Sequence, residues 1–237
     1  MERWGGALLQ ALHDSACVEQ AFDAVADAAQ QLGFDLCAYG YQFPLPFTRK
    51  RCYLISNYDP SWRARYEEAG YLRIDPTVQH ARRSLEPVLW NDATFRPAAQ
   101  LWDEARAFGL RHGWAQACFG PEGGVGLLTL ARDVEPLTMS ELRAKEMPMR
   151  FLVNVAHGAL SSWVLRFPPG LQLERLTPRE REVLRWAADG KTSNDTARLL
   201  SSSPHTVEFH MKNATRKMGA GSRPAATARA AATGLLR

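Results

Sequence analysis

The sequence predicts an α+β protein in two unequal domains, a larger N-terminal α/β/α sandwich and a small all-α C-terminal domain. The chain has 237 residues, which is more than one small domain needs and less than three domains need. Strand-like and helical patterns alternate up to about residue 165, whereas only helical patterns follow residue 176. The stretch Phe167-Pro168-Pro169-Gly170 between them is typical of a linker. We therefore expect domains at residues 1–165 and 176–237, joined by residues 166–175.

Composition and charge narrow the class of protein. Hydrophobic residues make up 46% and charged residues 23%, which is typical of a globular chain with a substantial core and excludes disordered, collagen-like and coiled-coil proteins. Residues 1–170 hold 17 Lys and Arg against 19 Asp and Glu, a net charge of −2, whereas residues 171–237 hold 12 against 6, a net charge of +6. A short basic module behind a nearly neutral domain favours a phosphate-bearing partner for the module.

Targeting and metal-binding signals are missing from the sequence. No apolar run reaches the roughly 18 to 20 residues that span a bilayer, and the N-terminus lacks a basic segment followed by an apolar one. We therefore expect a cytoplasmic protein without membrane partners. The four cysteines show no C-x-x-C spacing, so we expect reduced thiols, no metal and no cofactor.

In the larger domain, strand-like and helical segments follow one another at unequal lengths. This order predicts a sheet that helices cover on both faces. The expected helices are 18–32, 60–69, 77–83, 97–108 and 140–164, and the expected strands are 36–41, 52–56, 88–90, 114–119 and 126–131.

In the C-terminal module, four helices are expected. The first begins with Thr177 as N-cap, Pro178 and Glu180 in a capping box, and ends at Gly190. The second follows Thr192 or Ser193 and ends near Leu200. The third spans 204–218 with one apolar face, and the fourth spans 223–233. A helix, a short turn and a basic amphipathic helix favour a helix-turn-helix that enters the DNA major groove. A helical bundle with a solvated basic face is the alternative.

Three segments resemble the LuxR-type helix-turn-helix: Leu176 to Leu184, Gly190 to Thr192, and Thr206 to Asn213. The characteristic Glu, Leu and Gly of that motif fall on Glu180, Leu184 and Gly190, where the sequence predicts capping, core and C-cap roles. The resemblance implies double-stranded DNA as a partner. It implies base contacts from Glu208, Phe209 and Lys212, and phosphate contacts from Lys191, Thr192, Thr206, Arg216 and Arg223.

Glu208 departs from the resemblance, because the family often has Lys or Asn at that position. A carboxylate facing DNA is repelled unless it accepts from a cytosine amino group. Either the protein binds an altered site, or Glu208 turns aside to pair with Lys212 one helical turn later. We favour the ion pair.

Aromatic residues recur at helical spacing in the larger domain, at Tyr58, Trp62 and Tyr66, with Asp75 close behind. Such a stripe is more often core than ligand pocket. However, these rings carry polar groups, and with a carboxylate they are suited to a small polar head group on an apolar tail. Asp75 also precedes Pro76, which is typical of a helix N-cap, and its two oxygens allow both roles.

This region resembles the autoinducer-binding domain of LuxR-family quorum-sensing regulators, whose recurring positions appear here as Trp62, Tyr66, Asp75, Pro76, Trp90 and Gly113. The resemblance covers essentially the whole chain. It implies a central antiparallel sheet and an N-acyl-homoserine lactone as ligand. Trp62 would donate to the lactone carbonyl, Asp75 would accept the amide N–H, and Tyr58 with Thr129 would bind the acyl carbonyl.

The remaining pocket residues follow from the same resemblance. Tyr66 and Trp90 would contact the chain and ring, and Thr77 and Trp102 complete the candidate site. The wall of the acyl chain would consist of small and aliphatic residues: Ala38, Gly40, Leu110, Ala115 and Leu127. Small residues at 38 and 40 favour medium or long chains.

The expected mechanism couples the two domains. A ligand at a thousandfold excess over its dissociation constant stabilises the domain it fills by about 4 kcal/mol. We expect binding to rigidify the N-terminal domain, which dimerises through residues 140–164 and presents two basic modules to an inverted-repeat operator. An activator would also contact RNA polymerase.

Two other functions remain open at this point. A lactone hydrolase would use His80, His112 and Asp75 as acid–base groups, but the sequence contains neither a His-x-His-x-Asp cluster nor a Gly-x-Ser-x-Gly elbow, so we expect no enzyme. A LuxR-type regulator that answers a non-lactone molecule, or none, is the nearer alternative. The retained Trp62 and Tyr66 disfavour it.

Overall fold

The computed structural model describes residues 2–166 and 174–237, so most of the expected linker, residues 166–175, lies outside the described residues. The chain divides into two compact units, the first built mainly from residues before 167 and the second mainly from residues after it. We describe each unit by itself. Within the two described ranges, no helix combines the length and apolar character that crossing a bilayer requires.

The N-terminal unit is built on a five-stranded antiparallel sheet with the strand order β2-β1-β5-β4-β3. The strands are β1 Leu36–Gln42, β2 Cys52–Ser56, β3 Val88–Leu89, β4 His112–Phe119 and β5 Val125–Arg132. All five lie at the positions that the alternating patterns predict. The predicted antiparallel sheet is therefore confirmed.

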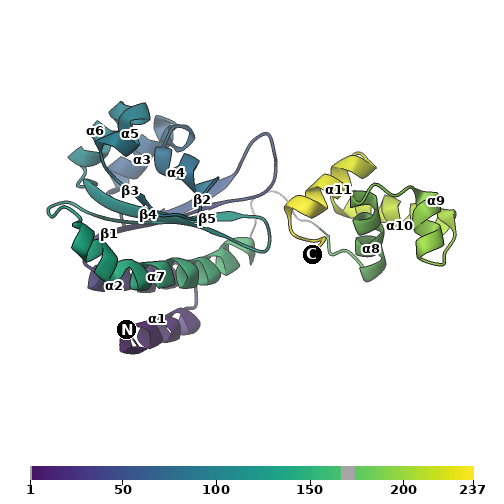
Figure 1. Cartoon of the computed structure of the whole chain (residues 1–237), viewed down its shortest axis with the longest axis horizontal. Helices are drawn as coiled ribbons and strands as arrows, with labels where there is room; N and C mark the ends of the chain where they lie inside the picture. The colour runs from purple at the N-terminus through teal and green to yellow at the C-terminus, as the bar shows by residue number, and fades with distance from the viewer. Residues whose placement is uncertain (1, 167–173) are drawn as a thin grey trace. The chain divides into compact units, whose positions relative to one another are not determined.

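Helices cover both faces of this sheet, as Figure 1 shows. One face carries α3 Pro60–Glu68, α4 Pro76–Ala81, α5 Asp92–Phe95 and α6 Ala99–Ala107, with 3-10 turns at Tyr71–Arg73 and Arg96–Ala98. The other face carries α2 Val18–Gln31 and the long α7 Met139–Arg166, and α1 Glu2–Asp14 contacts α2. The predicted three-layer sandwich is confirmed.

Two elements differ from the expectation. Helix α1, which contacts α2, is not among the helices expected from the sequence. The pair Gly5-Gly6 lowers intrinsic helix propensity there, and packing compensates for it. The expected helix 97–108 is preceded by α5 and a 3-10 turn, because Asn91 caps α5 by accepting from the Thr94 amide at 2.8 Å.

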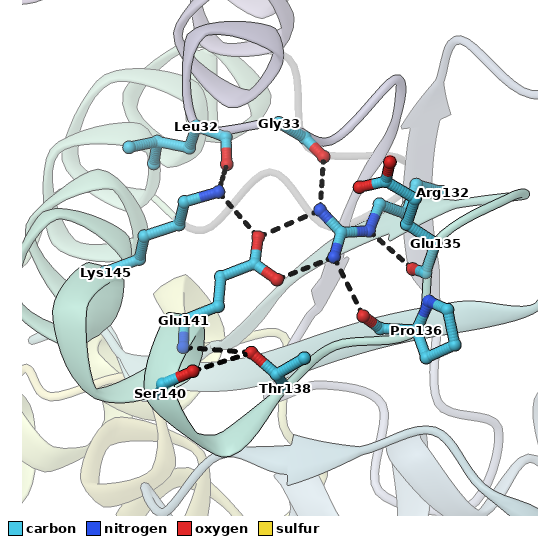
Figure 2. A network of polar contacts seen from close by, with 9 residues as sticks. All are labelled: Leu32, Gly33, Arg132, Glu135, Pro136, Thr138, Ser140, Glu141 and Lys145. Carbon is cyan, nitrogen blue, oxygen red and sulfur yellow. Dashed lines mark hydrogen bonds and ion pairs between the residues drawn. The ribbon is translucent and has the colours of Figure 1, made fainter.

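A polar network joins the end of β5 to α7 and to the end of α2 (Figure 2). Arg132 donates to Glu141 at 2.7 Å and to the carbonyl of Gly33 at 3.3 Å, while Lys145 donates to Glu141 and to the carbonyl of Leu32, both at 2.6 Å. Hydrogen bonds from Arg132, followed by those from Lys145, lower the pKa of Glu141 from 4.5 to about 2. The network thus fixes one end of α7 against the sheet.

The described part of the C-terminal unit contains four helices: α8 Pro178–Ala188, α9 Ser193–Leu199, α10 Pro204–Lys217 and α11 Arg223–Ala232. The side chains of Thr177, Thr192, Ser203 and Ser222 cap their N-termini. The predicted box of Thr177 and Glu180 is present, and Gly190 has a φ of +78°. The core contains the predicted apolar face of the third helix: Val207, Met211, Ala214 and Met218. The predicted helix-turn-helix arrangement is confirmed.

Candidate functional site

Asp75 stands at the N-terminus of α4 with its carboxylate held by neighbours. Oδ1 accepts from the amide and the hydroxyl of Thr77 at 2.8 and 2.6 Å, and Oδ2 accepts from the Tyr66 hydroxyl at 2.9 Å. Burial raises the pKa of Asp75, while the bonds from Thr77 and Tyr66 oppose that shift. The predicted N-cap role is confirmed. Each carboxylate oxygen has two lone pairs, so Oδ2 can accept one more donor.

Trp62 is the centre of an aromatic cluster beside this carboxylate. It is 3% exposed, and its ring centroid lies 6.0 Å from Tyr66, 6.2 Å from Tyr71 and 5.4 Å from Phe108. Tyr58, Trp90 and Leu36 contact the same cluster, in which Leu110 and Trp102 are buried. The aromatic stripe is therefore part of the core, and it gathers most of the predicted pocket residues.

Trp90 and Trp102 meet at right angles, with ring centroids 6.4 Å apart. Trp102 stacks on Phe95 at 4.5 Å, and its indole N–H donates to Asp92 at 2.7 Å. Its only polar group is thus already used, and Trp102 offers a ligand nothing but an apolar surface. Trp90 lies directly over Gly113, where a Cβ atom would come within 2.3 Å of the indole ring. This close approach explains why glycine is required there.

The sheet presents small residues to the aromatic cluster. Leu36 and Ala131, which are paired across β1 and β5, contact the cluster, so the residues two positions along each strand lie on the same face. One cross-strand row on this face contains Ser56, Ala38, Thr129 and Ala115, and the next contains Leu54, Gly40, Leu127 and Ala117. The predicted acyl wall residues of β1, β4 and β5 therefore share one surface.

Several polar atoms of this surface and of the aromatic cluster are buried without a hydrogen-bond partner among the described residues, and they include Tyr58 Oη, Ser56 Oγ and Trp90 Nε1. Burial raises the pKa of Tyr58 well above its usual value, so its hydroxyl stays protonated and able to donate. All three are donors, which suits a ligand with several oxygen acceptors. Sequence reasoning names Tyr58 and Trp90 but misses Ser56, because a strand-end serine carries no local signal of burial.

A hollow of about 670 Å³ borders the same aromatic residues. Trp90 and Trp102 line it together with charged residues, including Asp92, Arg106 and Arg111. A neutral ligand with an acyl tail would leave these charges unsatisfied, whereas the small residues of the sheet face suit it. The sheet face is therefore the better candidate for the pocket.

In the C-terminal unit, α10 buries Val207 and Met211 and exposes the predicted contact residues. Thr206, Glu208, Phe209, Lys212 and Arg216 lie outside the buried face of this helix, with Phe209 at 58% exposure. Lys191 and Thr192 are exposed at the turn that precedes α9. The predicted contact residues of α10 are therefore accessible to a partner.

Two predicted phosphate contacts carry structural bonds. Arg223 donates to the carbonyl of Lys191 at 2.6 Å and to the Ser193 hydroxyl at 3.2 Å, which ties α11 to the turn before α9. Arg216 pairs with Glu174 at 2.5 Å. The sequence does not predict a further ion pair on α10, between Lys217 and the buried Glu180. Lys217 Nζ lies 2.8 Å from Glu180 Oε2.

The expected ion pair between Glu208 and Lys212 is wrong. Over the described part of α10, no ion pair links the two side chains. Solvent-accessible pairs of this kind gain little from pairing because water screens their charges. Glu208 thus stays exposed on α10 without Lys212 as a partner.

Comparison with known families decides what these two units are. The family described as "Autoinducer binding domain" matches residues 18–160, which is more than half of the chain, and "Bacterial regulatory proteins, luxR family" matches residues 174–230. The chain belongs to the LuxR family. It is therefore a DNA-binding transcriptional regulator of the quorum-sensing type, with a domain for a small-molecule autoinducer.

Individual relatives agree with the family. The LuxR-family chain is 37% identical to the transcriptional activator protein AnoR of Acinetobacter nosocomialis over 100% of both chains. A structure of SdiA in complex with octanoyl-rac-glycerol matches it with a TM-score of 0.85 and 33% identity, over 100% of this chain and 96% of that one. The lactone-dependent LuxR-family factor CepR2 of Burkholderia cenocepacia matches with a TM-score of 0.65 and 32% identity, over 69% of this chain and 96% of that one. AnoR is named as a transcriptional activator and CepR2 as a transcription factor, and neither name describes an enzyme.

Proposed function

We propose that residues 1–165 bind an N-acyl-homoserine lactone. The observation that carries this proposal is the Asp75 carboxylate, which Thr77 and Tyr66 hold with one oxygen still able to accept, next to a buried Tyr58 hydroxyl that has no partner within the described ranges. An amide N–H donates to Asp75, and the acyl carbonyl accepts from Tyr58 with Thr129. The relative CepR2 is described as N-acylhomoserine lactone dependent, which supports the same ligand class.

The rest of the proposed site surrounds these polar groups. Trp62 donates to the lactone carbonyl, while Tyr66, Trp90 and Trp102 cover ring and chain. The acyl chain lies on the small residues of the sheet face, with Ala38, Gly40, Ala115, Leu110 and Leu127 as its wall. No cofactor takes part, and we propose no catalytic residue.

The proposed output is regulated DNA binding by residues 176–237. Phe209, Lys212 and Glu208 face base edges, and Lys191, Thr192 and Thr206 contact phosphates. Arg216 and Arg223 also contact phosphates once they release their present bonds, which for Arg216 go to Glu174 and for Arg223 to Lys191 and Ser193. The chain acts as a homodimer on an inverted repeat, with two half-sites about one helical turn apart. Exposed uncharged residues of α7, which include Met147 and Asn154, supply part of the surface for that dimer, next to the exposed charges of Arg143 and Glu146. An activator also contacts RNA polymerase.

The decisive experiment identifies the ligand. The full chain is expressed in a host that is fed acyl-homoserine lactones of different length, and the molecules that co-purify are identified by mass spectrometry. We expect one lactone class at close to one molecule per chain. Trp62→Phe and Asp75→Asn each remove one polar contact to the head group, so both should abolish this retention while the variants remain folded by circular dichroism. Retention unchanged in both variants would contradict the pocket assignment.

A second ligand class has one specific observation in its favour. The SdiA structure that matches the whole chain holds octanoyl-rac-glycerol, which has an acyl chain and a polar head group but no amide. A regulator that binds a non-lactone molecule of this kind would retain acylglycerol in the same experiment. Asp75→Asn separates the two classes, because only the lactone offers an amide N–H to the carboxylate.

A further inference from the structure

The loop between β1 and β2 carries a concentration of positive charge. Arg49, Lys50 and Arg51 follow one another in this loop, and residues 36–58 contain no Asp or Glu. This stretch therefore has a net charge of +3, although residues 1–170 as a whole have a net charge of −2. A local excess of one sign raises the electrostatic potential at that place and attracts a partner of the opposite sign.

A fourth cation, from another element, lies beside the loop. Arg82 directly follows α4, and its Nε donates to the Gln42 side chain at 2.9 Å. Gln42 is the last residue of β1, so this bond places Arg82 next to the beginning of the loop. The side chains of all four cations are exposed. The four residues Arg49, Lys50, Arg51 and Arg82 are termed the basic patch.

Carboxylates neutralise many cations elsewhere in this domain, but not three members of the basic patch. The cations that pair with Asp or Glu are Arg65, Arg106, Arg111, Arg132, Lys145 and Arg150. Among the residues that the structure describes, Arg49, Lys50 and Arg82 form no such ion pair. Their charges are therefore available to an external anion.

Contacts within the loop hold its cations in place. The Phe43 amide donates to the carbonyl of Arg51 at 2.9 Å, which closes the base of the loop. Lys50 Nζ donates to the carbonyl of Pro44 at 3.3 Å and lies 5.7 Å from the centre of the Phe47 ring. A cation that is already held in position loses less conformational entropy when it binds a partner.

We propose that the basic patch contacts the phosphate backbone of the DNA that the C-terminal unit binds. DNA is the polyanion that the chain itself brings to the patch: both units belong to one chain, so bound DNA is present at a high effective concentration. Contacts to phosphate carry no sequence information and add affinity for every duplex alike. The inference goes beyond the proposed function, in which only residues 176–237 contact DNA, and it does not depend on the identity of the small-molecule ligand.

The test measures how DNA binding depends on salt. A full chain with Arg49→Gln, Lys50→Gln and Arg82→Gln is compared with the wild-type chain on a duplex of random sequence, by fluorescence anisotropy at several salt concentrations. Each lost phosphate contact should reduce the slope of log affinity against log salt by about 0.9, so three lost contacts should reduce it by about 2.7. The loss of affinity should be largest at low salt, where counterion release contributes most. An unchanged slope overturns the inference.

The matched control is a full chain with Arg63→Gln, Arg73→Gln and Arg96→Gln. These arginines are exposed on the same domain, lie outside the basic patch and form no ion pair among the described residues. Each triple variant loses three positive charges, which lowers the net charge from +4 to +1. The control slope should equal that of the wild-type chain. Equal reductions in the two triple variants would indicate a general effect of net charge and overturn the inference.

Lys191→Gln separates the inference from the phosphate contacts proposed for the C-terminal unit. It should reduce the slope in the wild-type chain and again in the patch variant, because the two sets of residues contact different phosphates. A reduction by Lys191→Gln alone overturns the inference and leaves the proposed function standing. A reduction by the patch variant alone supports the inference and contradicts the proposed role of Lys191. A patch that binds an acidic protein surface instead of DNA gives the first of these two results.

Discussion

Small residues around the candidate pocket matter because their short or missing side chains leave room for neighbouring groups. Gly113 has no unusual backbone conformation, yet its missing side chain admits the Trp90 indole, and the backbone amide of Trp90 donates to the Gly113 carbonyl at 2.8 Å. Ala38 and Gly40 likewise leave room beneath the aromatic cluster. Family resemblance points to Gly113, and the geometry supplies the reason.

Gly113→Ala should therefore destabilise the N-terminal unit by about 1 to 3 kcal/mol, because the added Cβ would sit 2.3 Å from the Trp90 ring. Urea unfolding of the full chain measures the change. Gly158→Ala is the matched control, since a Cβ there meets nothing within 4 Å, and it should stabilise α7 by up to about 1 kcal/mol. Equal stability of Gly113→Ala and the wild-type chain would show that Trp90 can move aside at no cost.

At the scale of elements, the Arg132–Glu141–Lys145 network ties α7 and the end of α2 to β5. Glu141 is 18% exposed at its side chain, so water screens these charges only in part. The partners of this network come from segments far apart in the sequence. No local pattern predicts it, although the helices that carry it are predicted.

The stability of the chain should depend on pH through this network. The pKa of Glu141 is about 2 in the folded chain and 4.5 when unperturbed, so its contribution of up to about 3 kcal/mol is complete above pH 4.5 and disappears as the pH falls toward 2. Glu141→Gln should thus lower the unfolding midpoint in urea at pH 7, and the difference should narrow between pH 5 and pH 3. Glu146→Gln, which removes an exposed pair with Arg150, should change little at any pH. A pH-independent effect of Glu141→Gln would assign its role to packing.

At the scale of the whole molecule, the N-terminal and C-terminal parts of the chain differ in net charge. The net charge of −2 before residue 171 is compatible with the neutral lactone that we propose as ligand, and the +6 after it suits a partner rich in phosphate. Glu208 is the exception on α10, where it remains exposed and forms no ion pair with Lys212. That carboxylate fits an operator that presents a cytosine amino group.

Salt dependence separates the two kinds of DNA contact. Lys191→Gln should weaken binding to every duplex alike and reduce the slope of log affinity against log salt by about 0.9 for each phosphate that the variant no longer neutralises. Lys212→Gln should instead relax the preference between operator variants, at a cost of about 1 to 3 kcal/mol for the base pair it contacts. Fluorescence anisotropy at several salt concentrations, with operator and random duplexes, measures both. Identical behaviour of the two variants would refute the division into phosphate and base contacts.

Local patterns were sufficient for most of the elements and for the family. These patterns depend on residues that are close together in the sequence, so they can be recognised without the fold. Examples are the helix caps Asp75, Thr177 and Ser203 and the alternation of residues along the strands. Helix α1 was not predicted because its glycine pair lowers helix propensity, whereas packing against α2 stabilises the helix.

Everything that depends on long-range pairing needed the fold. The alignment of Ser56 with Ala38 and Thr129, the insertion of Trp90 over Gly113 and the pair between Glu180 and Lys217 join distant segments. Strand register and burial determine which hydroxyls remain unpaired, and neither quantity is a property of a short stretch of chain. The sequence was therefore enough to establish what kind of molecule this is, whereas the three-dimensional arrangement was needed to show which atoms its ligand must satisfy.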